Sequence, residues 1–413
     1  MNRKAVSGIM LTLLLIDMLI LTFNFQPVKA FGNIYIRADG SVDPPTAPIQ
    51  RDGNIYTFTD NIYDKIVVER DNVVVDGAGY KVQGTGSGTG IDLSYRNNVT
   101  LKNVEVTNFT YGIYLIYSSN NVFAGNNASL NQNGIWIWNC NSVNVTDNIV
   151  SHNKYGIWLH TSNYSIIIGN VITSNNGTGV FWWKNNGTII LHNTISDNAY
   201  DGVFMRSVTY SIVRENTITA NNQSGIGLSD SSGNIIIKNT ISNNELDGIY
   251  SFYSNRNIIS GNHIKANDWS GIFLDVAFNN NISGNSLTNN GHGIYLYESS
   301  NNIIYHNNFI NNTQQVYDDS WDFPDVPPSI SIWDDGYPSG GNYWSDYEEK
   351  YPNATELDGS GIWDTPYVID DNNQDNYPIV PEFPTWTSML LILIILTVAI
   401  AITKRRLLKT PIR

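Results

Sequence analysis

The feature that most constrains this chain is a Gly followed by Ile or Val, which recurs ten times at intervals of 22 or 23 residues. The repeated glycines are Gly90, Gly112, Gly134, Gly156, Gly179, Gly202, Gly225, Gly248, Gly271 and Gly293. Self-similarity at a fixed period of this length is typical of a solenoid, in which each repeat forms one rung stacked on the previous one. Because a solenoid grows along one axis, 413 residues need no single large core.

Each repeat is expected to form three short strands. A period-two alternation of apolar and outward-facing residues follows each Gly, as in Gly-Ile-Tyr-Leu-Ile at 112–116. The first and third positions after Gly are mostly aliphatic and are expected to face inward. Two shorter strands follow in each repeat, such as 166–168 and 171–173. We expect the Gly itself to fix the turn that starts each rung.

An Asn lies fourteen residues after the Gly in nine consecutive repeats. Asn tolerates the left-handed backbone conformation that a sharp corner needs, and stacked Asn side chains can hydrogen-bond from rung to rung. We expect this column to be structural. It comprises Asn126, Asn148, Asn170, Asn193, Asn216, Asn239, Asn262, Asn285 and Asn307.

These patterns predict an all-β fold, a right-handed parallel β-helix of about ten rungs with three strands each. At a rung spacing of about 4.8 Å, the rod is about 48 Å long. We expect a signal peptide at 1–30, an N-terminal cap with one irregular rung at 31–89, and the repeats at 90–312. An acidic C-terminal cap at 313–380 and an anchor segment at 381–413 complete the chain.

The N-terminal residues are typical of an export signal, and the C-terminal residues are typical of a membrane anchor. Arg3 and Lys4 precede a long apolar stretch, and a small-residue cleavage site ends at Ala30. An uncleaved N-terminal anchor is the other interpretation. A second apolar stretch, 389–402, precedes a basic tail and is expected to form a transmembrane helix with the tail in the cytoplasm. This orientation places 31–380 outside the cell, where eleven Asn-x-Ser/Thr sequons favour a glycoprotein.

The segment Pro381-Glu382-Phe383-Pro384, followed by the apolar stretch and basic residues, resembles the PEF-type sorting signals of archaeal surface proteins. The resemblance implies that a sortase-like membrane enzyme cuts near the motif and transfers the protein to a lipid. A permanent membrane anchor is the alternative. Either arrangement puts the protein on the cell surface.

The overall charge limits the partners. The formal net charge is −14 and charged residues are only 15% of the chain, which argues against nucleic acid as a partner. A single cysteine, Cys140, excludes an internal disulfide framework.

Several motifs resemble the NosD-like β-helix family, which belongs with carbohydrate-binding and sugar-hydrolase β-helices. They are the opening Asp76-Gly77-Ala78-Gly79, repeated Gly-Asn corners such as Gly125-Asn126, and the closing segment Gly340-Gly341-Asn342-Tyr343-Trp344. The resemblance covers roughly residues 53–380 and implies the β-helix fold. NosD itself is linked to copper delivery for nitrous oxide reductase, so a copper role has to be tested on the residues of this chain.

A copper site requires Met, Cys or His ligands close together. His192 and His306 share a column but lie five rungs apart, about 24 Å at the expected rung spacing. The other histidines lie in separate columns or rungs, and only His152 with His160, or Cys140 with a neighbour, could meet. We therefore expect no cofactor, with copper disfavoured and calcium left open.

Catalysis on a polysaccharide requires a pair of carboxylates on one face. Gly291-His292-Gly293 matches a short motif of polygalacturonases, but no Asn-Thr-Asp or Asp-Asp pair lies in the preceding rungs. Asp201 and Asp247 each precede a repeat Gly, without an assigned partner. We therefore name no catalytic residue and leave a carbohydrate-active enzyme as an alternative.

Aromatic residues recur at the second and fourth positions after the repeat Gly, which are expected to face outward. A flat face of such rings suits stacking against sugar rings, with the densest stretch between Trp136 and Trp183. The alternative is that the rings stack on one another and stabilise the sheet. The candidate ligand-binding residues are Tyr114, Trp136, Trp138, Trp158, Phe181, Trp183, Phe204, Tyr250, Phe273 and Tyr295.

The acidic segment 313–380 contains candidates for a calcium site, Asp370, Asp371 and Asp375, because clustered carboxylates can hold calcium. A solvated acidic cap is the alternative. Together, the patterns favour a surface-anchored β-helix that binds an extracellular polysaccharide or serves as a structural or adhesion component of the envelope. A carbohydrate-active enzyme and a copper-handling accessory protein remain as alternatives.

Overall fold

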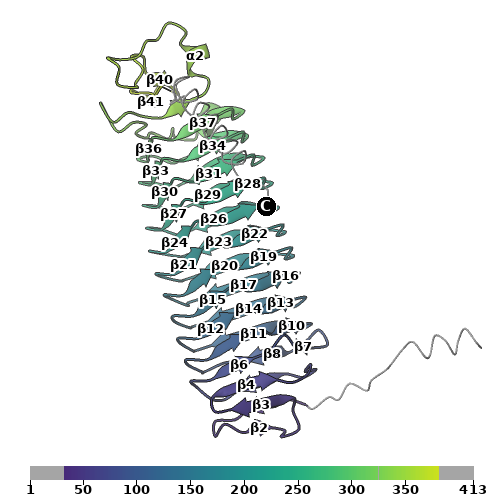
Figure 1. Ribbon diagram of the computed structural model, residues 1–413. Coiled ribbons are helices and arrows are strands. Elements are labelled where there is room, and N and C mark those ends of the chain that lie inside the picture. Colours follow the sequence, from purple (N-terminus) through teal and green to yellow (C-terminus); the bar gives the residue numbers. More distant parts are fainter. Residues whose placement is uncertain (1–31, 324, 381–413) are drawn as a thin grey trace, which may run out of the picture.

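The computed structural model describes residues 32–323 and 325–380, which form a rod of stacked turns (Figure 1). Within these residues, three long sheets follow the rod and contain 14, 13 and 12 strands. We name them sheets A, B and C. Apart from the antiparallel hairpins at the N-terminal end, neighbouring strands in these sheets are parallel. The prediction of a parallel β-helix with three strands per rung is confirmed.

The strands of each sheet follow one another along the rod. Sheet A contains β2 (Val42–Asp43), β1 (Ile34–Ile36), β5 (Ile66–Val68), β8 (Thr89–Asp92), β11 (Tyr111–Ile116), β14 (Asn133–Trp138), β17 (Tyr155–His160), β20 (Val180–Trp183), β23 (Val203–Arg206), β26 (Ile226–Ser229), β29 (Ile249–Phe252), β32 (Ser270–Asp275), β35 (His292–Tyr297) and β38 (Gln314–Asp318). Sheet B contains β3 (Ile49–Asp52), β4 (Ile55–Phe58), β6 (Val74–Asp76), β9 (Thr100–Lys102), β12 (Val122–Ala124), β15 (Asn144–Thr146), β18 (Ile166–Ile168), β21 (Ile189–Leu191), β24 (Ile212–Arg214), β27 (Ile235–Ile237), β30 (Ile258–Ser260), β33 (Asn281–Ser283) and β36 (Ile303–Tyr305). Sheet C contains β7 (Lys81–Gln83), β10 (Glu105–Thr107), β13 (Asn127–Ser129), β16 (Ile149–Ser151), β19 (Val171–Thr173), β22 (Thr194–Ser196), β25 (Thr217–Thr219), β28 (Thr240–Ser242), β31 (His263–Lys265), β34 (Ser286–Thr288), β37 (Asn308–Ile310) and β39 (Tyr343–Trp344).

The described part of the chain contains about eleven complete rungs, from β5–β7 to β35–β37, where the sequence predicted about ten. The additional rung is the one that the sequence treated as irregular. Ile66 pairs with Ile91, so Lys65 stands where the next rung has Gly90. The repeat motif is absent there, although the strand is in place.

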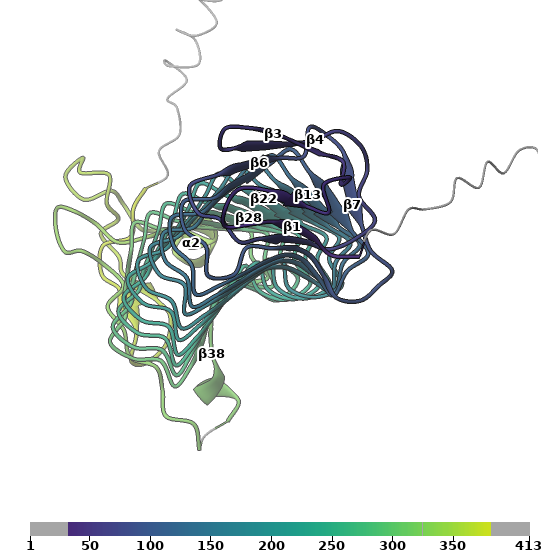
Figure 2. The ribbon, with the colours of Figure 1, turned by 90° about the horizontal axis from the view of Figure 1, so that it is seen from below.

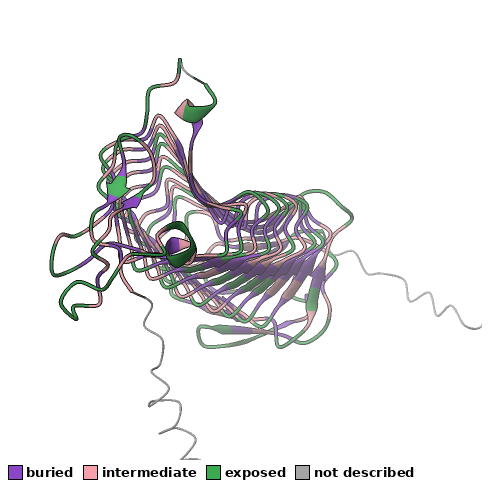
Figure 3. Cartoon of the chain, turned by 90° about the horizontal axis from the view of Figure 1, so that it is seen from above, coloured by how far each residue is buried: buried purple, intermediate pink, exposed green. Residues whose placement is uncertain are grey.

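The interior of the rod is one continuous apolar cluster. The first and third positions after the repeat Gly are buried, as with Ile135 and Ile137, or Ile157 and Leu159. Burial repeats from one turn to the next, and the turns superpose around a bent outline when the rod is viewed along its axis (Figures 2 and 3). The expected inward columns are therefore confirmed, with Trp182 as a large buried member.

The repeat Gly has a different role from the one predicted. Its φ angle is not in the left-handed region at any of the ten positions. Instead, a Cβ on Gly248 would lie 2.6 Å from the carbonyl oxygen of Gly271 and 2.4 Å from Ile264 Cγ2. The glycine column is required by close packing between rungs, so the expectation that it fixes a turn was wrong.

The Asn column forms a ladder of hydrogen bonds along the corner between sheets B and C. Asn148 Oδ1 accepts from the Asn126 backbone N–H at 2.9 Å and from its Nδ2 at 3.0 Å. The left-handed residue at this corner is the one before the Asn, as with Gly125 (φ 64°) and Asp147 (φ 54°). Asn is thus required here because its side chain hydrogen-bonds the next rung and backbone carbonyls of the chain. A left-handed φ at the Asn itself is not the reason.

A second Asn ladder, which sequence reasoning missed, lies five residues after the first. Asn153 Oδ1 accepts from Asn131 N at 2.9 Å, and Asn131 Nδ2 donates to the Val106 carbonyl at 2.9 Å. The column comprises Asn131, Asn153, Asn175, Asn198, Asn221, Asn244, Asn267, Asn290 and Asn312. Its distance from the preceding Gly is constant, so the change from 22 to 23 residues falls in the short turn into the next sheet A strand.

The C-terminal residues close the rod. They include η1 (Asp319–Trp321), α2 (Tyr347–Lys350) and the antiparallel pair β40 (Tyr367–Val368) and β41 (Gln374–Asp375). Trp344 of β39 stacks on Phe309 of the last complete rung, with ring centroids 4.3 Å apart. The predicted signal peptide, sorting signal and transmembrane helix lie outside the described residues, and among the residues that are described no helix is both long and apolar enough to cross a membrane.

Candidate outer-face site on sheet A

The outer face of sheet A carries two adjacent columns of side chains. In a strand such as β17, Gly156 and Ile157 are both buried, so Tyr155 before the Gly and Trp158 after Ile157 emerge on the same side. Their rings meet with centroids 5.1 Å apart. We call the residues before the repeat Gly the inner column and the second residues after it the stripe.

Strand pairing aligns the stripe residues rung by rung. In order, the stripe reads Tyr114, Trp136, Trp158, Phe181, Phe204, Gly227, Tyr250, Phe273, Tyr295 and Tyr317. The sequence analysis did not predict Tyr317, because its rung has Gln315 in place of the repeat Gly. Trp138 and Trp183 lie in the fourth-position column, separated by His160, whose ring stacks on Trp183 at 4.4 Å.

Most stripe rings stack on one another. Trp136 and Trp158 lie 4.7 Å apart at 15°, and Trp158 and Phe181 lie 4.0 Å apart at 15°. Both faces of Trp158 are therefore covered by neighbouring rings. Such pairs stabilise a sheet beyond their buried area, so the densest stretch presents mainly ring edges to the outside.

The stripe is interrupted at one rung, by Gly227. Phe204 precedes this break and Tyr250 follows it, two rungs apart, which is about 9.6 Å at the usual strand spacing. A Cβ on Gly227 would lie 2.8 Å from Phe204 Cδ2 and 3.4 Å from Asp201 Oδ1. The break is thus bordered directly by an aromatic ring and a carboxylate.

Two carboxyl groups of the inner column lie on either side of the break. Asp201 Oδ1 accepts from the Ser224 N–H at 3.2 Å, and Asp247 Oδ1 accepts from the Ser270 N–H at 3.1 Å. Asp247 is only 3% exposed. Loss of solvation by burial raises the pKa of both groups to about 7.

The sequence showed that Asp201 and Asp247 each precede a repeat Gly, but it did not pair them. In the structure the Gly and the residue after it are both buried, so the residue before the Gly lies in the column beside the stripe. The two residues are two rungs apart, about 9.6 Å, near the upper end of the separations in inverting glycosidases. The sequence contains a signal for this arrangement. Asp201, Ser224 and Asp247 precede the repeat Gly in three consecutive repeats.

Beyond the break, tyrosines of the stripe are held by further carboxylates. Tyr250 donates to Asp275 at 2.7 Å, and Tyr295 donates to Asp319 at 2.6 Å. Burial, followed by the bond to Asp275, raises the pKa of Tyr250. This half of the face is therefore rigid, polar and acidic.

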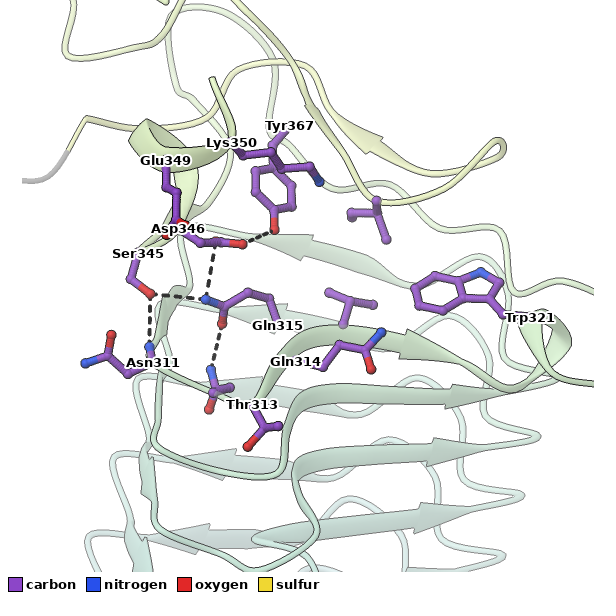
Figure 4. A pocket seen from close by; sticks show the side chains of 13 residues that line it. Asn311, Thr313, Gln314, Gln315, Trp321, Ser345, Asp346, Glu349, Lys350 and Tyr367 are labelled. Atoms are coloured by element: carbon purple, nitrogen blue, oxygen red, sulfur yellow. Dashed lines mark hydrogen bonds between the residues drawn. The ribbon is translucent and has the colours of Figure 1, made fainter. Parts of the chain in front are cut away.

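The stripe ends at a pocket of about 510 Å³ between the last strand of sheet A and the C-terminal cap (Figure 4). Tyr317 contacts Trp321 at the pocket edge, with centroids 5.6 Å apart. On the opposite wall, Asp346 accepts from Gln315 Nε2 at 3.3 Å and from the Tyr367 hydroxyl at 2.9 Å (Figure 4). Polar side chains form most of the pocket lining, and the Trp321 ring lies across from Asp346 and Tyr367 (Figure 4).

Comparison with known protein families agrees with the β-helix architecture. The model of the family described as periplasmic copper-binding protein (NosD) matches residues 66–247 and 220–349. This chain belongs to the NosD family. The resemblance noted in the sequence is confirmed at the level of family and fold.

The NosD family description raises the question of copper, and the residues that the structure describes do not fit a copper site. Cys140 is fully buried, with its pKa raised to about 12 by burial, and Met205 is also fully buried. His192 contacts Glu215, and His306 contacts the Ser339 carbonyl, at separate rungs. Within residues 32–323 and 325–380, no group of three or more His, Cys, Asp or Glu side chains is arranged to hold a metal ion.

The calcium candidates are also separated in the structure. Asp375 is fully buried and accepts from Trp344 Nε1 at 2.9 Å and Asn342 N at 2.6 Å. Asp370 instead accepts from Asn373 Nδ2 at 3.0 Å, and Asp371 is exposed. The carboxylates of Asp370 and Asp375 accept hydrogen bonds from groups of the cap, and we derive no calcium site from the three residues.

Solved structures with a similar fold include alginate epimerases and the Dettilon tailspike protein. The periplasmic alginate epimerase AlgG is 17% identical, with a TM-score of 0.41 over 65% of this chain and 79% of that one. A double mutant of AlgG gives a TM-score of 0.48 at 18% identity, covering 72% and 82% of the chains. The A-module of the mannuronan C-5 epimerase AlgE6 of Azotobacter vinelandii gives 0.46 at 12% identity, covering 64% and 85%. A search against curated proteins found no match. At these identities the likeness concerns the fold alone.

Proposed function

We propose that this protein binds a polysaccharide laid along the rod on the outer face of sheet A, outside the cytoplasm. One observation supports this function above the others. An aromatic stripe with one interruption, at Gly227, leads to a mainly polar pocket that has the Trp321 ring at its edge. Sugar-binding surfaces combine apolar ring contacts with hydrogen-bonding groups in this way.

We further propose that the stripe residues named from the sequence, Tyr114 to Tyr295, contact the ligand through their ring edges. We also propose, from the sequence, that the protein is exported, is anchored at the cell surface and is transferred to a lipid. An exported location agrees with the family description, which names a periplasmic protein. A cell-surface position would place the stripe within reach of envelope polysaccharides.

The proposal predicts that the double substitution Trp136→Ala/Trp158→Ala lowers polysaccharide affinity at least tenfold, because it removes two adjacent rungs of the stripe. The purified full-length protein would first be screened on a glycan array that includes neutral, amino and acidic polysaccharides. The affinity of both proteins would then be measured on the best ligand, with far-UV circular dichroism to confirm folding.

The control is the double substitution Tyr164→Ala/Tyr210→Ala, because both side chains are exposed away from the stripe, at 63% and 73%. Unchanged affinity of the stripe variant, or no glycan binding by the parent protein, would contradict the proposed function. Assaying the same mixtures for new reducing ends tests the alternative that Asp201 and Asp247 hydrolyse the chain.

A further inference from the structure

The stripe ends where the C-terminal cap begins. β38 is the last strand of sheet A, and Tyr317 is its stripe residue. Next to this strand lies the pocket of about 510 Å³, whose far side is formed by Glu349 and Lys350 of α2 and by Tyr367 of β40 (Figure 4). A polymer that follows the stripe along the rod therefore meets the cap at this pocket.

Hydrogen bonds hold the wall of the pocket that faces sheet C. Ser345 Oγ accepts from the Asn311 backbone N–H at 2.9 Å and from Gln315 Nε2 at 3.1 Å. Gln315 Nε2 also donates to Asp346, which accepts from the Tyr367 hydroxyl at 2.9 Å. Gln315 is only 8% exposed. The rod and the cap are joined along this wall, so the pocket suits the end of a chain better than its middle.

The Trp321 ring on the opposite side of the pocket differs from the rings of the stripe. Both faces of Trp158 are covered by neighbouring rings, whereas the ring contact of Trp321 within residues 32–323 and 325–380 is an edge contact with Tyr317 at 75°. Trp321 is 38% exposed. Because no other aromatic ring lies on its faces, Trp321 can stack against the apolar face of a sugar ring.

The charges of the pocket indicate the class of ligand. Its lining contains Asp346 and Glu349, and neither carboxylate is in an ion pair among the described residues. Lys350 is the cation of this lining, and its Nζ donates to the Val368 carbonyl at 2.6 Å. The lining is thus negative overall, which disfavours a ligand carboxylate and favours hydroxyl and ammonium donors.

We propose that the pocket between β38 and the cap binds the terminal sugar residue of a polysaccharide, stacked on Trp321 and donating hydrogen bonds to Asp346 and Glu349. This inference rests on the proposed polysaccharide function and adds where the bound chain stops. The terminal residue is a neutral or amino sugar, and a uronate is excluded from the pocket.

The test measures how many full-length protein molecules bind per carbohydrate chain, by titration calorimetry with hydroxyethyl cellulose, chitosan, cellotriose and the chitosan trimer. We expect one protein per chain for a trimer and its polymer alike, because each chain has one terminus of the fitting kind, and no binding of an alginate trimer. Trp321→Ala should weaken binding of the trimer about tenfold. Trp136→Ala/Trp158→Ala should leave it unchanged, because Trp158 lies seven rungs from Tyr317, about 34 Å away.

Phe323→Ala is the matched control for Trp321→Ala, because its ring is 56% exposed and does not line the pocket. Glu349→Gln should reduce the discrimination against the alginate trimer, whereas Glu348→Gln, an exposed neighbour outside the lining, should not. Several proteins per polymer chain, an unchanged affinity of Trp321→Ala, or equal binding of the alginate trimer would overturn the inference and leave the polysaccharide function standing. No binding of either polymer would contradict both.

Discussion

Individual residues on the outer face of sheet A carry an electrostatic cost. The carboxyl of Asp247 is nearly inaccessible to water, and its pKa is raised from 3.8 to about 7. Between about pH 4 and pH 7, this carboxyl therefore holds a proton in the folded protein and has released it in the unfolded chain. By linkage, this group favours the folded state at acidic pH, and that contribution is lost as the pH rises from about 4 to about 7.

Asp247→Asn should remove this pH dependence. A three-unit difference corresponds to about 4 kcal/mol at most, at 1.36 kcal/mol per pKa unit. Residual solvation of the carboxylate lowers this upper bound. The variant should therefore be more stable than the parent by about 1–3 kcal/mol at pH 8 and equally stable near pH 4. Asn is compatible with the column, because Asn133 occupies the same position and donates to the Thr110 carbonyl at 3.0 Å.

The measurement is the urea midpoint of full-length parent and variant at pH 4 and pH 8. Asp147→Asn, an exposed carboxylate, serves as the control and should leave both midpoints unchanged. An equal shift of the Asp247→Asn midpoint at the two pH values would show that burial of the charge is not the cause.

Each rung is fastened to the next by ladders at its corners, and a rung contacts only its neighbours. Asn193 Oδ1 accepts from both the backbone N–H and Nδ2 of Asn170 at 2.9 Å, and its Nδ2 donates to the Ile167 carbonyl at 2.9 Å. All of these groups are buried. The N–H and Nδ2 of Asn193 also donate to Asn216 Oδ1 of the next rung, at 2.9 and 3.0 Å. A single Asn therefore links three consecutive rungs.

Replacing Asn193 with Ala should destabilise the rod by about 2–4 kcal/mol, because a buried donor left without a partner costs about 1–3 kcal/mol and more than one group is affected. Thermal unfolding followed by circular dichroism measures the change. Asn222→Ala, at an exposed corner position, is the matched control and should stay within about 0.5 kcal/mol of the parent. Equal effects of the two substitutions would mean that the ladder is not a source of stability.

At the scale of the whole molecule, the ends of the rod are where copies of the chain could associate edge to edge. A parallel sheet that ends abruptly exposes unpaired strand edges, which pair readily with other chains. The C-terminal cap covers this edge through β39 and through Trp344, which stacks between Phe309 and Tyr367 at 4.3 and 4.2 Å. Trp344 Nε1 also donates to the buried Asp375 at 2.9 Å.

Trp344→Ala should therefore loosen the cap, lower stability by about 3–5 kcal/mol as for other large core truncations, and promote self-association. Light scattering as a function of protein concentration measures the association. Trp321→Ala, at a ring that is 38% exposed, should stay monomeric. A monomeric Trp344→Ala protein would show that the cap is not what blocks the edge.

The sequence by itself determined the architecture, because a constant 22–23-residue period places equivalent residues on top of one another. It fixed the inward Ile and Leu columns, the first Asn column and the aromatic stripe as positions along the chain. It assigned the wrong role to the repeat Gly, because only the stacked structure shows the approach of the Gly271 oxygen to Gly248.

Only the tertiary structure decided what the outer face presents. Because the repeat Gly and the residue after it are both buried, the residue before the Gly lies on the same side as the stripe, which places Asp201 and Asp247 in one column. Distances between rungs show that rings such as Trp158 are covered by their neighbours and that the Phe204 ring lies over Gly227, where a Cβ would be 2.8 Å from Phe204 Cδ2. A period gives the order of residues along a face, whereas burial, ring stacking and charge depend on contacts between rungs that a linear pattern does not contain.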